Sequence, residues 1–133
     1  MFYPSWIEIP VHNLERAVLF YRGVFNLSEV PSYDLDEEGM PMRVIVLLTS
    51  DKSVKGPGVS LVQSTRHKPS VDGLQVNFHV GDHATIDRVL GAVSRFGGEI
   101  VKPVIDMGDG VRYAVIRDSE SNTVAVSSYE ERA

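Results

Sequence analysis

Two short stretches of the chain carry polar side chains at every second position, and these are the residues whose types can do chemistry. Glu8 follows Trp6 at this spacing, and Asn77 and His79 follow Gln75. A carboxylate in a partly dry site can act as a general acid or base, and an imidazole can exchange protons with it. Amide groups orient a bound molecule through hydrogen bonds, and an indole ring stacks on it. These residue types together predict a site for a small organic molecule.

The residues between these polar positions are apolar, and each stretch therefore has two different faces. The apolar positions are Ile7, Ile9 and Val11 in the first stretch and Val76, Phe78 and Val80 in the second. Alternation with a period of two predicts strands. Buried polar groups need partners, so the polar faces predict a cavity in which a ligand or water supplies them. Two alternatives stay open: the polar residues bond only one another, or Glu8 is an ordinary salt-bridge or hydrated carboxylate.

A helical pattern follows each predicted strand. Asn13 and Asp82 stand where short acceptors cap helix N-termini. Apolar residues then recur at helical spacing, and Gly97 with Gly98 ends the second helix. The two apolar stripes consist of Ala17, Phe20, Tyr21, Val24 and Phe25, and of Ile86, Val89, Leu90, Val93 and Phe96.

Three more strands are predicted after each helix, so that the chain repeats a βαβββ pattern. We expect them at residues 28–34, 42–49 and 58–64, and at 99–106, 111–118 and 123–129. The acidic stretch 34–39 between the first two is interpreted as a solvated hairpin tip. The first module spans residues 1–67, a linker spans 68–73, and the second module spans 74–133. One such unit is too small for a good core, which predicts that the two pack together as an α+β protein.

Three segments resemble the vicinal oxygen chelate superfamily, which includes glyoxalases, bleomycin resistance proteins and extradiol dioxygenases. They are IEIPVHNLERAVLFYRGVF, VNFHVGDHATIDRVLGAVSRFGGEIVKPV and YAVIRDSESNTVAV, the last of which is similar to a closing hairpin written F-x-D-P-x-G-N. Ser119 and Ser121 replace its usual Pro and Gly. The resemblance implies a curved mixed sheet that forms a cup, with the helices on the outer face, and it implies a homodimer. It implies no single activity, because the family holds several kinds of enzyme as well as proteins that only sequester a ligand.

Metal enzymes of this family hold their ion with one residue on the first and one on the last strand of each module. The resemblance places these positions on Trp6, on Leu61 or Val62, on Gln75 and on Ala125. A hard divalent ion needs several oxygen or nitrogen ligands, and one amide does not make a site. We therefore expect no metal and no other cofactor.

The four histidines do not change the expectation about the metal. His12, His67 and His83 lie in turns or in the linker, and we interpret them as surface or structural residues. His79 shares a strand face with Gln75 and Asn77, and it stays a candidate for proton transfer.

The composition limits the classes of partner. The chain has 133 residues, a net charge of -5 and no cysteine, which excludes disulfides and thiolate sites. An acidic surface argues against nucleic acid and anionic membranes as partners. No signal peptide and no stretch of about 20 apolar residues is evident, so we expect a cytoplasmic protein.

Three functions follow from these observations. The first is a protein that binds a small organic molecule through Trp6, Glu8, Gln75, Asn77 and His79, without a catalytic metal. The second is a metal-independent or atypical glyoxalase-like lyase or isomerase, with Glu8 as general acid or base and His79 as its partner. The third is a glyoxalase-type metal lyase, which requires the metal positions to be assigned wrongly. If the first strands of the two modules pair, Glu8 meets Asn77 in a partly dry cavity.

Overall fold

The computed structural model describes residues 4–27, 32–37, 40–47 and 56–131, and the side chains of 32–37 and of Met40 are not described. The first module contains β1 (Trp6–Pro10), α1 (Leu14–Phe25), β2 (Ser32–Glu37), β3 (Met40–Leu47) and β4 (Gly58–Gln63). The second contains β5 (Val76–His79), α2 (His83–Val93), the 3-10 turn η1 (Ser94–Phe96), β6 (Glu99–Gly108), β7 (Val111–Arg117) and β8 (Thr123–Tyr129). The predicted βαβββ repeat is therefore confirmed.

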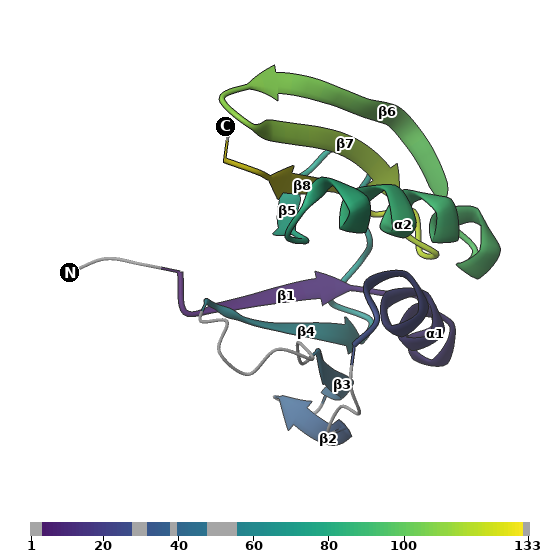
Figure 1. The fold of residues 1–133 in the computed structure, drawn as a ribbon. Helices are drawn as coiled ribbons and strands as arrows, with labels where there is room; N and C mark the ends of the chain where they lie inside the picture. Colours follow the sequence, from purple (N-terminus) through teal and green to yellow (C-terminus); the bar gives the residue numbers. More distant parts are fainter. Residues whose placement is uncertain (1–3, 28–31, 38–39, 48–55, 132–133) are drawn as a thin grey trace.

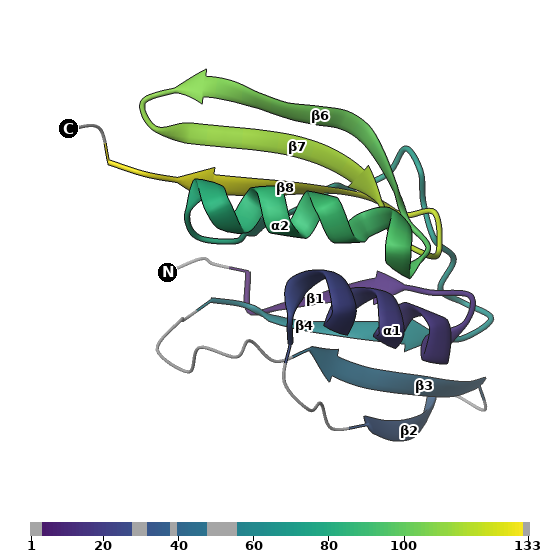
Figure 2. The same ribbon diagram turned by 45° about the vertical axis from the view of Figure 1, so that its right-hand side comes forward.

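Each module forms one four-stranded mixed sheet, and the strand orders are β1-β4-β3-β2 and β5-β8-β7-β6. The first strand of each module runs parallel to the last, and the other neighbours are antiparallel. The sheets lie one above the other with β1 and β5 at the adjoining edges, and β6 and β7 are visibly bent (Figure 1). Both helices cover the same side of the strands (Figure 2). The predicted α+β class, with the helices on one face, is confirmed.

The helices begin and end for local reasons that the sequence predicted. The side chain of Asn13 accepts a hydrogen bond from the Arg16 N–H at 3.0 Å, and that of Asp82 accepts one from the Thr85 N–H at 2.9 Å. These bonds satisfy amide groups that have no partner inside a helix. Gly97 follows η1 with a φ of 96°, a left-handed conformation that glycine adopts without steric cost. Both predicted N-caps and the predicted glycine stop are confirmed.

The strand limits differ from the predicted ones mainly around the acidic stretch. Residues 34–37 continue β2 and pair with β3 up to the partners Glu37 and Met40, so the interpretation of this whole stretch as a hairpin tip is wrong. Ladder pairing with β3 prevails there over the low strand propensity of aspartate and glutamate. The predicted residues 28–31 and 48–49 lie outside the described residues. The predicted strand 123–129 agrees with β8 at both ends.

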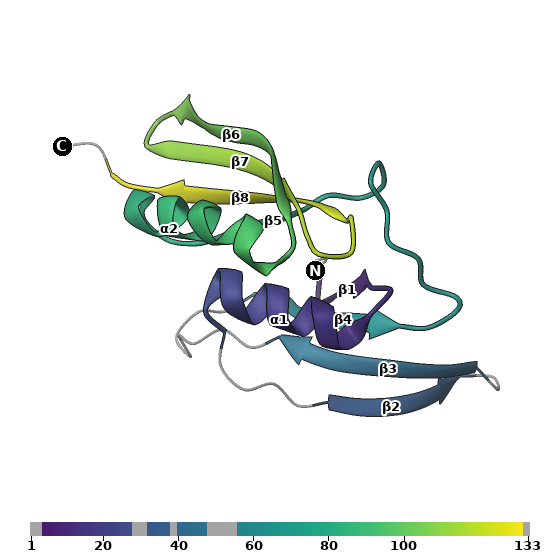
Figure 3. The ribbon, with the colours of Figure 1, turned by 90° about the vertical axis from the view of Figure 1, so that its right-hand side faces the viewer.

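One hydrophobic core lies between the helices and the strands, and both modules contribute to it. α1 and α2 pack side by side over it (Figure 3). The ring of Phe78 lies 5.1 Å from that of Phe25 and 6.1 Å from that of Tyr21, measured between centroids. The two modules are therefore joined on the helix side. The module boundaries at 1–67 and 74–133 stay a prediction.

The two first strands do not pair with each other, so the condition for a contact between Glu8 and Asn77 is not met. The ladder partner of Glu8 is Ser60 on β4, and that of Asn77 is Ala125 on β8. Each first strand pairs with the last strand of its own module, and within the described ranges no ladder joins the two sheets. Core packing and a loop between β7 and β8 take the place of strand pairing. No helix in the described part of the chain is long and apolar enough to cross a membrane.

Candidate functional site on the cup face

The face of the two sheets opposite the helices, here called the cup face, carries the predicted site residues. Ile9 and Val11 are buried beneath the helices, and Phe78 and Val80 pack against the same core. Trp6, Glu8, Gln75, Asn77 and His79 are all exposed. Because neighbouring residues of a strand point to opposite sides, the polar row lies on the cup face. The predicted division of the two faces is confirmed.

Trp6 is held in a fixed position on the cup face. Its indole N–H donates to the hydroxyl oxygen of Ser60 at 3.1 Å. Its six-membered ring occupies the space that a side chain at Gly58 would need, so glycine at this position allows the close contact. Trp6 nevertheless stays 48% exposed, so part of the side chain remains accessible to a ligand. The indole is an oriented aromatic surface rather than a mobile side chain.

Glu8 lies on the same face and contacts a histidine that the sequence analysis treated as structural. Its Oε2 is 3.3 Å from Nε2 of His67, and Nδ1 of His67 is 2.7 Å from the Ser64 hydroxyl. The Arg66 N–H also donates to that hydroxyl, at 3.1 Å. Since the hydroxyl accepts from Arg66, its own proton is free to point to Nδ1, which leaves the proton of a neutral imidazole on Nε2, facing Glu8.

This environment differs from the one predicted for Glu8. The side chain is 48% exposed, so the expected burial in a partly dry cavity is wrong for the single chain. The reason is the strand pairing, which places Ser60 rather than Asn77 beside Glu8. The sequence carried no direct signal for the contact with His67, because 59 residues separate the two. The contact depends on where the turn after β4 brings residues 64–67.

The second module places its polar residues in bonds of their own. Gln75 donates to the Tyr113 hydroxyl at 3.0 Å, and Asn77 accepts from the Ser127 hydroxyl at 3.1 Å. The expected bonds from these two amides to Glu8 are therefore not found. His79 is exposed on the same strand, and within the described residues its ring makes no hydrogen bond. The structure thus brings Glu8 together with His67, not with His79.

The four expected metal positions do not fit a divalent ion. Leu61 packs in the core beneath the helices, whereas Val62 lies with Met42 and Val44 in a separate apolar cluster. Ala125 is fully buried, and the indole nitrogen of Trp6 is a donor already bound to Ser60. Gln75 is left as the sole side chain of the four with a free acceptor oxygen. In the described ranges no group of three or more His, Cys, Asp or Glu residues is arranged to hold an ion.

The loop between β7 and β8 carries charged hydrogen-bond contacts between the modules, which no local sequence pattern predicted. Glu120 is buried and accepts hydrogen bonds from the N–H groups of His12 and Asn13, at 2.9 and 2.8 Å. Arg16 donates to both of its oxygens, at 2.7 and 2.9 Å. Burial acts to raise the pKa of Glu120, but the bonds from Arg16 and Asn13 prevail and hold that pKa below its ordinary value. A carboxylate at the N-terminus of α1 also favours the helix dipole.

Asp118 in the same loop accepts a hydrogen bond from the buried hydroxyl of Tyr21 at 2.6 Å. Burial raises the pKa of Asp118, although bonds from Tyr21 and Asn122 oppose the shift. Asn122 donates to the backbone oxygen of Pro10 at 2.7 Å, so a third loop residue also binds the first module. The quoted segment YAVIRDSESNTVAV contains all three loop residues, and their buried contacts make this loop a structural joint between the modules.

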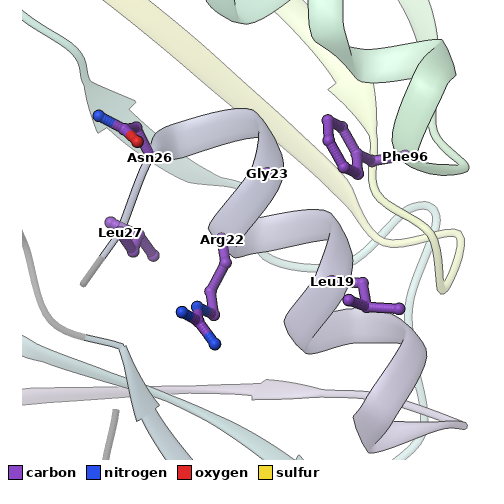
Figure 4. Close-up of a pocket in the computed structure, with 6 residues that line it drawn as sticks. All are labelled: Leu19, Arg22, Gly23, Asn26, Leu27 and Phe96. Atoms are coloured by element: carbon purple, nitrogen blue, oxygen red, sulfur yellow. The ribbon is translucent and has the colours of Figure 1, made fainter. Parts of the chain in front are cut away.

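The helix side of the molecule has a separate shallow pocket of about 330 Å³ (Figure 4). It lies between the C-terminal half of α1 and η1. The sheets separate it from the polar row on the cup face. The pocket is lined by Leu19, Arg22, Gly23, Asn26, Leu27 and Phe96. None of the predicted site residues contributes to it.

The family model of the Glyoxalase/Bleomycin resistance protein/Dioxygenase superfamily matches residues 4–126. The chain belongs to this superfamily. The resemblance given by the opening strands, the Gly-Gly stop and the closing hairpin is thereby confirmed.

Solved structures of superfamily proteins share the fold at low sequence identity. A glyoxalase family protein from Bacillus cereus has a TM-score of 0.75 at 18% identity, with 97% of this chain and 95% of that chain covered. A glyoxalase/bleomycin resistance protein/dioxygenase domain from Frankia has a TM-score of 0.70 at 13% identity, with 100% and 96% covered. A fosfomycin resistance protein from Listeria monocytogenes has a TM-score of 0.67 at 16% identity, with 95% and 90% covered. No curated protein matches the sequence. The superfamily is thus known, and these likenesses extend to the fold alone.

Proposed function

We propose that this superfamily member binds a small organic molecule on its cup face and does so without a catalytic metal. The observation that carries the proposal is the position of Trp6. The hydrogen bond to Ser60 and the close contact with Gly58 hold the indole ring, while 48% of the residue stays exposed. A fixed aromatic ring loses little conformational freedom on binding, which makes it an efficient surface for stacking.

The surroundings of Trp6 supply the other features of a ligand site. Val62, Met42 and Val44 form a buried apolar cluster on the same sheet, so the accessible apolar surface is that of Trp6 itself. Glu8 and His67 offer a charged acceptor and an imidazole next to it. Sites for small molecules combine an apolar surface with a few polar groups that fix orientation. Gln75, Asn77 and His79 lie on the cup face of the second sheet, from which they would contact the other end of a ligand.

A second candidate function rests on the contact between Glu8 and His67. A carboxylate and an imidazole 3.3 Å apart, with Ser64 behind the imidazole, can pass a proton from one to the other. This favours a metal-independent or atypical glyoxalase-like lyase or isomerase in which Glu8 removes a proton from the bound molecule. His67 replaces His79 as the expected partner of Glu8 in this version.

We also propose that the protein is a homodimer. Large apolar side chains lie exposed along β6, the edge strand of the second sheet: Ile100, Val101, Ile105 and Met107. A long apolar edge strand invites pairing or coverage by another chain.

The binding proposal can be tested with the tryptophan itself. Trp6 is the single tryptophan of the chain, so the intrinsic indole fluorescence reports this position alone. A library of small aromatic compounds should contain members that shift or quench the emission in a saturable way, and Trp6→Leu should weaken their binding as measured by calorimetry. Leu19→Ala is the matched control, because Leu19 is 68% exposed on the helix side. Equal affinities for the parent and Trp6→Leu would rule out the indole as the binding surface.

A further inference from the structure

Charge on the cup face decides which aromatic molecules suit the site, and this step rests on the proposed function. On β1, β4 and β3, the side chains that share this face with Trp6 are Glu8, Ser60, Val62, Met42, Val44 and Val46. Glu8 is the one charged group among these side chains, and its Oε2 lies 3.3 Å from Nε2 of His67. The first sheet thus presents a carboxylate beside an aromatic ring, and the described side chains of β1, β3 and β4 on this face include no lysine or arginine.

The charged groups of the second sheet do not change this balance. Arg117 is bound to Glu99 at 2.7 Å, so the two charges offset each other. Lys102 stands on β6, which is the far edge of that sheet from β5. The chain as a whole carries a net charge of -5. Among the described strand side chains, no lysine or arginine lies next to Trp6 on the cup face.

The spacing along β1 also fits one kind of ligand. Residues two apart on a strand lie roughly 7 Å from each other on the same face. A ring stacked on Trp6 would therefore reach Glu8 with a cationic group carried on a chain of about two atoms. The Glu8 carboxylate would accept charge-assisted hydrogen bonds from that ammonium group.

We infer that the site on the cup face selects aromatic molecules that carry a cationic amine, with Trp6 holding the ring and Glu8 binding the ammonium group. In the absence of ligand, the His67 ring contacts the Glu8 carboxylate. The ammonium group of the ligand displaces His67 from that carboxylate. Neutral aromatic compounds of the same shape bind more weakly, and aromatic carboxylates bind most weakly, because they face the Glu8 carboxylate.

Three probes that share an indole ring and differ in charge test the inference: tryptamine is cationic, tryptophol is neutral and indole-3-acetate is anionic. Binding is followed through the indole N–H signal of Trp6 in ¹⁵N-labelled protein, which is unique because the chain has one tryptophan. The titrations are made at low salt, which keeps electrostatic screening small. Tryptamine should bind about threefold to tenfold more tightly than tryptophol, a range set by a charge-assisted bond to a half-exposed carboxylate. Indole-3-acetate should bind least.

Two variants separate the role of Glu8 from a general effect of net charge. Glu8→Gln should bring tryptamine to the affinity of tryptophol and leave tryptophol within about twofold of the parent. Glu15→Gln removes the same charge from the helix side, where Glu15 pairs with Arg43, and it should preserve the order of the three probes. A cooperative thermal transition for each variant shows that it folds.

The outcomes distinguish this inference from the proposed function. If tryptophol binds at Trp6 but tryptamine binds no more tightly, the cup-face site stands and its preference for amines is refuted. The same holds if Glu8→Gln leaves the preference intact. If none of the three probes moves the Trp6 signal at millimolar concentration, both the inference and the aromatic site fail.

Discussion

Replacing Glu120 with glutamine should destabilise the protein strongly without touching the cup face. In the native structure the Glu120 carboxylate accepts two backbone N–H groups at the N-terminus of α1 and a bidentate bond from Arg16. Glutamine removes the charge and replaces one carboxylate oxygen by an NH₂ group. That group is a donor, and it would face either the backbone N–H groups or the Arg16 guanidinium, which are donors too. The side chain is buried, whereas that of Arg16 is 53% exposed. The ion pair itself therefore contributes little, and the two bonds to backbone N–H groups dominate.

A hydrogen bond to a charged group contributes about 1.5–3 kcal/mol, and surface ion pairs contribute less than about 1 kcal/mol. We therefore expect Glu120→Gln to lower the free energy of unfolding by about 2–4 kcal/mol, measured by urea denaturation. The pKa of Glu120 is lowered in the folded state, so its stabilisation is complete above the unfolded value of about 4.3 and is lost as pH falls through the folded value. The difference between parent and variant should therefore shrink below pH 4.

Glu15→Gln is the control for this experiment, because Glu15 is also acidic, lies in the first turn of α1 and is 66% exposed. It should cost less than about 1 kcal/mol. If Glu120→Gln costs no more than this control at pH 7, the loop is not the joint between the modules that its contacts indicate.

Three further predictions concern other parts of the molecule. Ser121 has a φ of 69°, so Ser121→Gly should relieve left-handed strain and raise the free energy of unfolding by about 0.5–1 kcal/mol in urea; a loss of stability would contradict this. A chelator should leave the melting temperature unchanged, and added nickel, zinc or manganese should not raise it. A metal bound at a hundredfold excess over its dissociation constant would stabilise the fold by about 2.7 kcal/mol, and that result would overturn the assignment of Trp6, of Leu61 or Val62, and of Ala125. Light scattering at micromolar concentration should give the mass of a dimer, and Ile105→Lys on β6 should shift it toward that of the 14.7 kDa monomer; a monomeric parent would refute the dimer.

Local patterns predicted most of the fold because local physics determines those features. Asn13 and Asp82 cap helices because their short side chains reach the free N–H groups of the first helical turn. The alternation of residue types around Ile9 and Phe78 indicates which side of each strand is buried. Residues 34–37 escaped prediction because their strand conformation depends on pairing with β3. A strand made of acidic residues has no local signature.

The candidate site was predicted only in part because its contacts join distant segments. The cup-face position of Trp6 and Glu8 followed from strand alternation. The partner of Glu8 did not, because it depends on β1 pairing with β4 and on the turn that carries His67. The buried contacts of Asp118 and Glu120 with the first module likewise arise only when the two modules pack.

The most direct test of the central claim is to locate a bound ligand relative to the protein by intermolecular nuclear Overhauser effects. The cup face and the pocket on the helix side compete as sites, and their lining residues do not overlap. For a compound that binds the parent protein, we predict contacts from the ligand to the ring protons of Trp6 and to the side-chain protons of Glu8, both of which are about half exposed. Contacts to Leu19 and Phe96 in their place would put the ligand in the helix-side pocket and contradict the assignment of the cup face as the binding site.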